Sequence, residues 1–212
     1  MQLISQIFEF LLHLNKYLPE ILNNYGNFSY LILFLVIFCE TGLVLTPFLP
    51  GDSLLFMIGA LSASGALNPY LIVIILMAAS IIGDTTNYHI GKAVGKKTKD
   101  LNSIKFLNKE HLDRTHAFYE KHGSKVVIIA KFIPIVRTFS PFVAGLGAMT
   151  FKKFLFFNIL GGTLWINIFF LLGYFFGNLQ FVKDNFLLVI GFIVCISVLP
   201  AVVTFFIEKR KK

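Results

Sequence analysis

The chain has 212 residues, of which 56% are hydrophobic and 14% are charged, and its formal net charge is +8 at pH 7. A soluble domain carries about 25% charged residues, so this composition excludes a water-soluble globular protein and indicates an integral membrane protein. The length allows one compact membrane domain. The positive charge fits an anionic membrane surface, and no nucleic-acid partner is predicted.

Residues 1–27 predict an amphipathic helix. Apolar side chains recur at helical spacing from Ile4 to Leu12 and again from Leu18 to Leu22. The segment lacks the basic start and the cleavage site of a signal peptide. We therefore expect it at the membrane interface or against the helix bundle, and the side of the membrane on which it begins stays open.

The first long apolar region begins at Phe28 and is interrupted by acids and prolines. The interrupting residues are Glu40, Pro47, Pro50 and Asp52. We predict that residues 40–67 form a broken element with the prolines as hinges. Within it, Gly51-Asp52-Ser53 predicts the start of a short helix whose N-terminus faces the membrane interior.

A second apolar region begins at Tyr70 and continues into the motif at residues 83–95. Asp84 borders the bilayer here, and a helix cap or interface role stays open beside a role in the site. Residues 92–125 follow, with nine Lys or Arg against four acids, and predict a basic cytoplasmic stretch on the lipid surface. The histidines of this stretch lack metal-ligand spacing, so neither a metal nor a cofactor is predicted.

Residues 126–151 are apolar but contain two cations and two prolines, namely Lys131, Pro134, Arg137 and Pro141. Lys125 and Lys152 flank the segment, and the positive-inside rule places both on the cytoplasmic side. The segment therefore enters and leaves by one face, and its prolines are predicted hinges. Ser140-Pro141 predicts an N-cap and first helical position, with Arg137 one turn ahead.

Two uncharged spans complete the chain. They contain 24 residues from Phe154 to Gly177 and 22 residues from Phe186 to Ile207, whereas roughly 20 are enough to cross a bilayer. Residues 178–212 thus predict a C-terminal transmembrane helix and a basic cytoplasmic tail. Residues 28–177 form the main membrane domain.

These segments predict an all-α polytopic membrane protein in which transmembrane helices surround two opposed re-entrant helical hairpins. Broken elements in corresponding positions are typical of inverted-repeat transporters. An unpaired charge at the bilayer centre costs about 2.5–3.5 kcal/mol or more, so Glu40 and Asp52 are expected to pair with Lys131 and Arg137. A static salt-bridge lock between the two hairpins is the alternative interpretation.

Three stretches resemble the DedA family, the bacterial branch of the VTT-domain membrane proteins. They are "ETGLVLTPFLPGDSLLFMIGAL", "GDTTNYHIGKAVG" and "FYEKHGSKVVIIAKFIPIVRTFSPFVAGLGAMTFKKFLFFNILGGTLWI". The resemblance spans about Leu33 to Gly177. It implies opposed re-entrant hairpins, lipid translocation, proton-dependent transport and the bacterial inner membrane.

The resemblance also implies roles for particular residues. The family's functional acids fall on Glu40 and Asp52, and its basic pair falls on Lys131 and Arg137. The first basic position is typically Arg in this family. Lys131 keeps the charge but lacks the two-pronged geometry with which a guanidinium binds phosphate.

The buried charges and this resemblance together predict a flippase-like or scramblase-like transporter of an anionic lipid, with protons as a coupling partner. The resemblance implies undecaprenyl phosphate or a phospholipid as that lipid. The predicted substrate-binding residues are Asp52, Ser53, Lys131, Arg137 and Ser140, and the predicted charge network is Glu40, Asp52 and Asp84. A proton-coupled carrier of small cations or drugs and a non-transporting assembly factor stay open, as does a homo-oligomer. No nucleophile–base pair or paired catalytic carboxylates indicate an enzyme.

Overall fold

The computed structural model describes residues 14–43, 51–97, 119, 123–185, 188–189 and 191–192. The regular structure of these residues is entirely helical. Its elements are α2 (Leu14–Tyr25), α3 (Phe28–Gly42), α4 (Gly51–Ala63), α5 (Pro69–Lys97), the 3-10 turn η2 (Gly123–Lys125), α7 (Val126–Ala130), α8 (Pro134–Val143), the π-helical turn η3 (Ala144–Ala148), α9 (Phe151–Phe176) and α10 (Gln180–Asp184).

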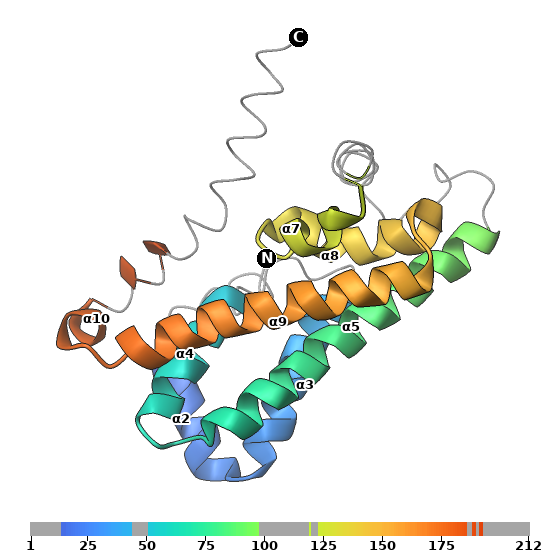
Figure 1. The fold of residues 1–212 in the computed structure, drawn as a ribbon. Coiled ribbons are helices and arrows are strands. Elements are labelled where there is room, and N and C mark those ends of the chain that lie inside the picture. The colour runs from blue at the N-terminus through green and yellow to red at the C-terminus, as the bar shows by residue number, and fades with distance from the viewer. Residues whose placement is uncertain are drawn as a thin grey trace, which may run out of the picture.

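The long helices α5 and α9 run side by side in opposite directions and form the axis of the molecule (Figure 1). Residues 69–95 and 151–176 are both long and apolar enough to cross a membrane. Large apolar side chains remain exposed along both helices, among them Ile74, Phe156 and Leu164. Helices that are apolar on their outer face fit a lipid environment, and the predicted span at 154–177 is confirmed as a helix.

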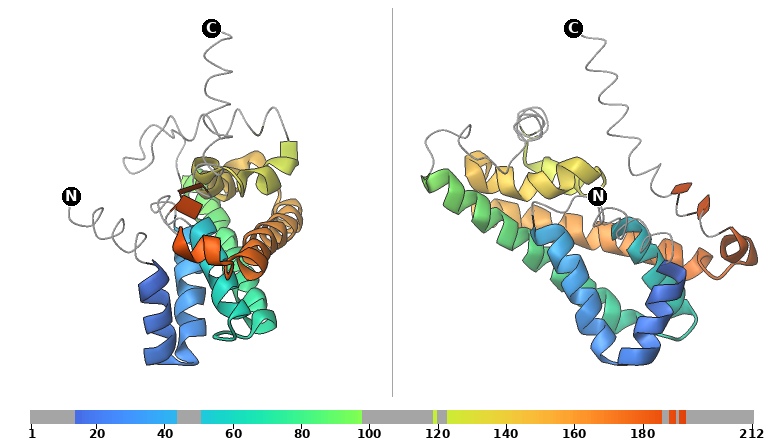
Figure 2. Two further views of the ribbon diagram at one scale, coloured as in Figure 1. Left: turned by 90° about the vertical axis from the view of Figure 1, so that its left-hand side faces the viewer. Right: turned by 180° about the vertical axis from the view of Figure 1, so that it is seen from behind.

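The shorter helices cover the α5–α9 pair in two groups, as the views in Figures 1 and 2 show. One group is α3 and α4, which pack with the first half of α5 and the second half of α9 in an apolar cluster that contains Ile37, Leu55 and Ile72. The other group is α7 and α8, which form a second apolar cluster with Tyr88 and Phe154. The polar residues of the middle of α5 therefore lie between two apolar clusters.

Glycines allow these helices to approach closely. A Cβ atom at Gly59 would overlap the carbonyl oxygen of Phe170, and one at Gly173 would overlap that of Phe56, so α4 and α9 cross almost backbone to backbone. Gly91 is equally close to the backbone of Phe142. Small residues at such crossings are characteristic of helices that associate in membranes.

Residues 126–148 contain the short helices α7 and α8, which are separated by a break at Lys131–Ile133. Pro134 is the first residue of α8, and Ile133 before it is extended, as a residue before proline prefers. The predicted helix start at Ser140-Pro141 is wrong, because both residues lie inside α8. The φ of proline is compatible with a helix, so a proline near the C-terminal end costs one backbone hydrogen bond without ending the helix.

The predicted start of the earlier short helix at Gly51 is confirmed by α4. Other predictions concern residues outside the described part. They are the hinges Pro47 and Pro50, residues 1–13 of the N-terminal helix, most of the basic stretch at 92–125 and most of the span at 186–207. In the described part of the N-terminal segment, α2 is helical from Leu14 and contains Pro19.

A substitution that adds one methyl group tests the close crossing of α4 and α9. Gly173→Ala should reduce the free energy of unfolding by about 1–3 kcal/mol, because the methyl group meets the Phe56 backbone. Gly162→Ala in the same helix is the matched control, since its Cβ would lie 3.6 Å from Ser80 Oγ. Thermal unfolding of the purified protein in detergent compares them, and equal stability of the two variants would contradict this packing.

Candidate functional site

Arg137 joins two acids from different helices. It lies in the first half of α8 and is 5% exposed. Its Nη1 donates to Asp52 Oδ1 at 3.0 Å, and its Nη2 donates to Glu40 Oε1. Glu40 is near the end of α3 and Asp52 is in the first turn of α4. One guanidinium therefore holds α3, α4 and α8 together through charge-assisted hydrogen bonds.

The carboxylate of Glu40 also occupies the N-terminus of α4. Gly51 N–H donates to Glu40 Oε1 at 3.2 Å, so this oxygen accepts from the helix start and from Arg137 together. A Cβ at Gly51 would overlap the carboxylate, which makes glycine necessary for this approach. A helix N-terminus beside an arginine is a favourable site for an anion, and here the anion is a side chain of the protein.

Trp165 of α9 lies close to both buried cations. Its Nε1 donates to Asp52 Oδ1 at 2.7 Å. The Arg137 Cζ atom is 4.7 Å from the centre of its ring, and Lys131 Nζ is 5.5 Å from it. The indole therefore stabilises both cations through its π face and orients one of the acids through its N–H.

Lys131 pairs with an acid on α5. Its Nζ forms an ion pair with Asp84 Oδ2 and donates to Ser80 Oγ at 2.9 Å. The expected pairing of Glu40 and Asp52 with both cations is therefore corrected, because both acids contact Arg137 while Lys131 contacts a third acid. Lys131 lies in the break between α7 and α8, where its side chain reaches the polar residues of α5.

The cluster carries unequal numbers of acids and bases. Among the described residues, the buried Asp, Glu, Lys and Arg side chains are Glu40, Asp52, Asp84, Lys131 and Arg137. Three carboxylates and two cations leave one excess negative charge when all are ionised. One proton shared among the carboxyls, or one bound cation, would balance the cluster.

Two asparagines near the cluster join its helices by hydrogen bonds to backbone carbonyls. Asn87 Nδ2 donates to the carbonyls of Thr41 at 3.3 Å and Thr138 at 2.8 Å, so it joins α5 to α3 and α8. Asn158 Nδ2 donates to the Ile81 carbonyl at 3.2 Å and joins α9 to α5. These bonds fix the spacing of the helices that carry the charged groups.

Some polar atoms of the cluster have no hydrogen-bond partner within the described part of the chain. They are Glu40 Oε2, Ser53 Oγ, Asp84 Oδ1, Asn87 Oδ1, Asn158 Oδ1 and Arg137 Nε. Most are acceptors, and one is a guanidinium donor. The cluster thus retains capacity for water, a proton or a ligand group.

The remaining predicted site residues differ in their surroundings. Ser53 is fully buried in the first turn of α4. Ser140 Oγ lies 2.9 Å from the hydroxyl of Tyr119, which also donates to the Ser140 carbonyl at 3.0 Å. Burial raises the pKa of the Tyr119 phenol above its ordinary value, so it remains a neutral donor. Ser140 is therefore engaged by a residue from the basic stretch.

Comparison with known proteins identifies the family. The family model of the VTT domain matches residues 49–175. Protein DedA of Escherichia coli K12 is 47% identical over 212 residues, which cover 99% of this chain and 97% of that protein. The chain belongs to the DedA family. No solved structure gives a significant match.

Other DedA relatives are named as membrane proteins. An uncharacterized membrane protein of Mycobacterium tuberculosis H37Rv is 43% identical over 173 residues, covering 80% of this chain and 75% of the relative. The inner membrane protein YqjA of Escherichia coli K12 is 37% identical over 149 residues, covering 70% and 68%. With the two apolar helices α5 and α9, these names identify the chain as a membrane protein.

Sequence reasoning missed two residues that this DedA-family structure brings into the cluster. They are Trp165 and Ser80, neither of which is among the site residues predicted from the sequence. The available signal was that Trp165 is the only tryptophan of the chain and shares a helix face with a polar asparagine. A tryptophan N–H needs an acceptor when it is buried, which indicates a polar neighbour.

The pairing of Lys131 with Asp84 predicts strong coupling between them. Lys131→Met leaves the Asp84 carboxylate buried without its cation and should cost about 3–5 kcal/mol of stability. The double variant Lys131→Met/Asp84→Asn should recover most of that loss. Thermal unfolding of wild type, both single variants and the double variant in detergent measures the coupling, and additive losses would show that the two side chains act independently.

Proposed function

We propose that this protein is a flippase-like or scramblase-like transporter of an anionic lipid, with undecaprenyl phosphate or a phospholipid as its cargo. The observation that supports it most directly is the position of Glu40 Oε1, which accepts from Gly51 N–H at 3.2 Å and from Arg137. A phosphate oxygen placed there would find the same two donors. Glu40 acts as an internal substitute for the phosphate when no lipid is bound.

Two re-entrant hairpins would bring this anion position into the membrane. Helix α4 has 13 residues, or about 20 Å at 1.5 Å per residue, which is too short for a hydrocarbon layer of about 30 Å. Helices α7 and α8 have 5 and 10 residues and are separated by a break at Lys131–Ile133, where the second hairpin would turn. The contacts of Arg137 with Glu40 and Asp52 join these two broken elements.

Exchange of partners would drive binding and release of the lipid. Both terminal nitrogens of Arg137 donate to carboxylates in the described arrangement. Proton binding to Glu40 or Asp52 would weaken these contacts and leave the guanidinium to the phosphate. The excess carboxylate makes such a proton electrostatically favourable, so transport would respond to a pH gradient.

The other donors of the cluster would give the headgroup its second contacts. Lys131 would contribute a point charge rather than the guanidinium fork that is typical of the family, and Ser53 a buried hydroxyl. Ser140 would act only after its contact with Tyr119 opens.

The chain would be arranged in three parts in a bacterial inner membrane. Residues 1–27 would lie at the membrane interface, residues 28–177 would form the transport domain, and residues 178–212 would end on the cytoplasmic side.

The excess carboxylate also favours a second candidate, a proton-coupled transporter of small cations. Asp84 Oδ1 and Glu40 Oε2 are buried acceptors without a hydrogen-bond partner in the described residues. In this case the acids would be the substrate site and the cations would only position them. Glu40→Ala would then abolish transport, whereas Lys131→Ala would reduce it little.

Translocation in liposomes tests the proposal. Purified protein would be reconstituted with a labelled polyprenyl phosphate and, separately, with a labelled phospholipid. We expect Arg137→Ala to slow translocation of the preferred lipid at least about tenfold, because a buried bidentate donor to the headgroup is lost. The matched control is Lys125→Ala, which removes an exposed cation outside the cluster.

The translocation rates of the polyprenyl phosphate and the phospholipid would show which of the two the protein prefers. Absence of transport of both lipids by well-folded wild-type protein would refute the lipid proposal and favour the cation carrier. Unchanged transport by Arg137→Ala would refute the role of the anion position.

The variant Glu40→Gln tests whether the Glu40 carboxylate competes with the lipid phosphate for Arg137 or only stabilises the structure around it. The glutamine can still accept from Gly51 N–H but loses its ion pair with Arg137, so a lipid phosphate should bind at least about tenfold more tightly. Translocation by this variant should lose its response to a pH gradient. Polyprenyl phosphate binding in detergent and pH-jump transport in liposomes measure the two effects, and a variant that binds the lipid less tightly than wild type would contradict the competition.

A further inference from the structure

A pocket of about 420 Å³ lies where the C-terminal end of α5, the turn η3 and the start of α9 meet. None of the five buried charged residues of the cluster lines it. Its walls include the apolar side chains Leu146, Met149 and Phe151. The floor approaches α5 backbone to backbone, since a Cβ at Gly145 would overlap the Tyr88 carbonyl.

The rim of this pocket is positively charged. Lys92 lines the pocket and is exposed, and the exposed Lys152 and Lys153 directly follow Phe151 of the lining. The exposed His89 lies beside the pocket, with its ring centre 5.1 Å from that of Phe151. Neither residues 85–97 nor residues 144–157 contain an acid, so no carboxylate of these two segments neutralises the cations.

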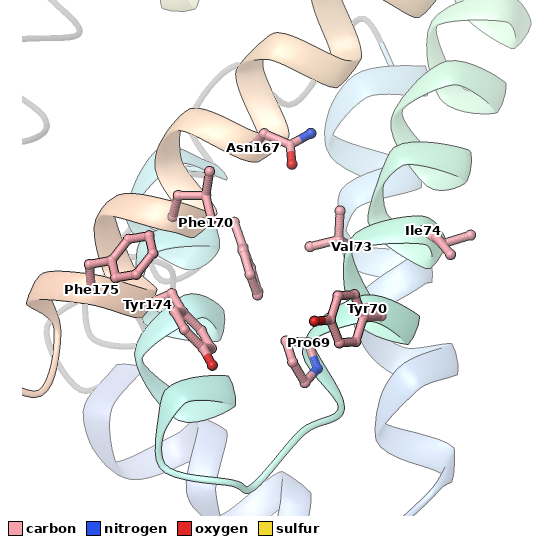
Figure 3. Close-up of a pocket in the computed structure, with 9 residues that line it drawn as sticks. Pro69, Tyr70, Val73, Ile74, Asn167, Phe170, Tyr174 and Phe175 are labelled. Atoms are coloured by element: carbon pink, nitrogen blue, oxygen red, sulfur yellow. The ribbon is translucent and has the colours of Figure 1, made fainter.

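A groove at the other end of the α5–α9 pair provides a contrast. It has a volume of about 350 Å³, and Tyr70, Phe170 and Tyr174 point toward it in Figure 3. Among the residues that the structure describes, no Lys, Arg, His, Asp or Glu lines this groove. The described residues at the two ends of the helix pair therefore differ in charge, and of these two hollows the pocket beside Lys92 combines an apolar wall with a cationic rim.

We propose that the pocket beside Lys92 binds the headgroup of an anionic phospholipid from the adjoining membrane leaflet. The pocket lies at the ends of both candidate spans, where a bilayer presents its phosphates. Lysines attract anionic lipids at such a surface and keep their apolar stems against hydrocarbon. A zwitterionic headgroup would bring an ammonium group to a rim at which residues 85–97 and 144–157 offer it no carboxylate, so anionic lipids are preferred.

This site is separate from the proposed transport site and does not depend on it. It would hold a lipid at the edge of the α8–η3 segment, which packs on α5 beside the pocket. The bound lipid would be a structural or entry-side ligand of the transporter. Its recognition uses exposed lysines, whereas the central cluster uses buried arginine and lysine.

Lipid binding by the purified full-length chain tests this proposal. Phosphatidylglycerol and phosphatidylcholine would be titrated separately into protein in a non-ionic detergent, and native mass spectrometry would count the lipids bound. We expect one phosphatidylglycerol site per chain that the triple variant Lys92→Gln/Lys152→Gln/Lys153→Gln weakens at least about tenfold. The control Lys183→Gln, at an exposed site beyond α9, should bind like wild type.

A second variant distinguishes binding in the pocket from a general electrostatic attraction between anionic lipids and the surface lysines. Gly95→Leu keeps every charge but places a side chain into the pocket, beside Leu146, and should also weaken phosphatidylglycerol binding at least about tenfold. Unfolding temperatures would verify that both variants fold. Equal affinity of wild type for the two lipids, an unaffected Gly95→Leu variant, or displacement of the lipid by 10 mM inorganic phosphate would each overturn the proposal.

Discussion

The burial of Arg137 is the constraint on which the rest of this structure depends. A guanidinium that leaves water loses several kcal/mol of hydration and regains it only from carboxylates in good geometry. No single helix supplies those carboxylates, so Glu40 from α3 and Asp52 from α4 must meet Arg137 of α8. The same requirement brings Trp165 of α9 over the guanidinium, since its N–H shares Asp52 with Arg137. Four helices are thus positioned by one cation.

Close helix packing makes that arrangement sterically accessible. Gly51 leaves room for the Glu40 carboxylate, and the Gly59 and Gly173 crossings let α4 lie against α9 with Asp52 beside Trp165. In a lipid environment such packing and interhelical hydrogen bonds replace the hydrophobic effect as the main source of helix association. The two asparagines near the cluster contribute those hydrogen bonds. A polar site is therefore held by small residues and amides together with the two apolar clusters.

The charge cluster has two halves, one around Arg137 and one around Lys131, and they differ in the number of partners of the cation. Both cations lie near the indole of Trp165, but Arg137 has two carboxylate partners, whereas Lys131 has one carboxylate and one hydroxyl. A guanidinium with several partners can exchange one of them for a phosphate and remain compensated. An ammonium with a single carboxylate has no such reserve, so Lys131 and Asp84 form the more static half. Family membership and the names of the relatives agree with a membrane protein and specify neither cargo nor coupling.

The sequence by itself determined the membrane class, the long span at 154–177, the start of α4 at Gly51 and the need for Arg137 and Lys131 to find acids. These follow from composition, hydrophobic length, capping residues and the cost of a buried charge, all of which are local. Only the tertiary structure decided which acid meets which base. The contacts of Arg137 with Glu40 and of Lys131 with Asp84 span 97 and 47 positions of the chain, and local patterns contain no information about such partners. The helix through Ser140-Pro141 was likewise decided by packing, because a proline compatible with helical φ marks a start in one context and an interior in another.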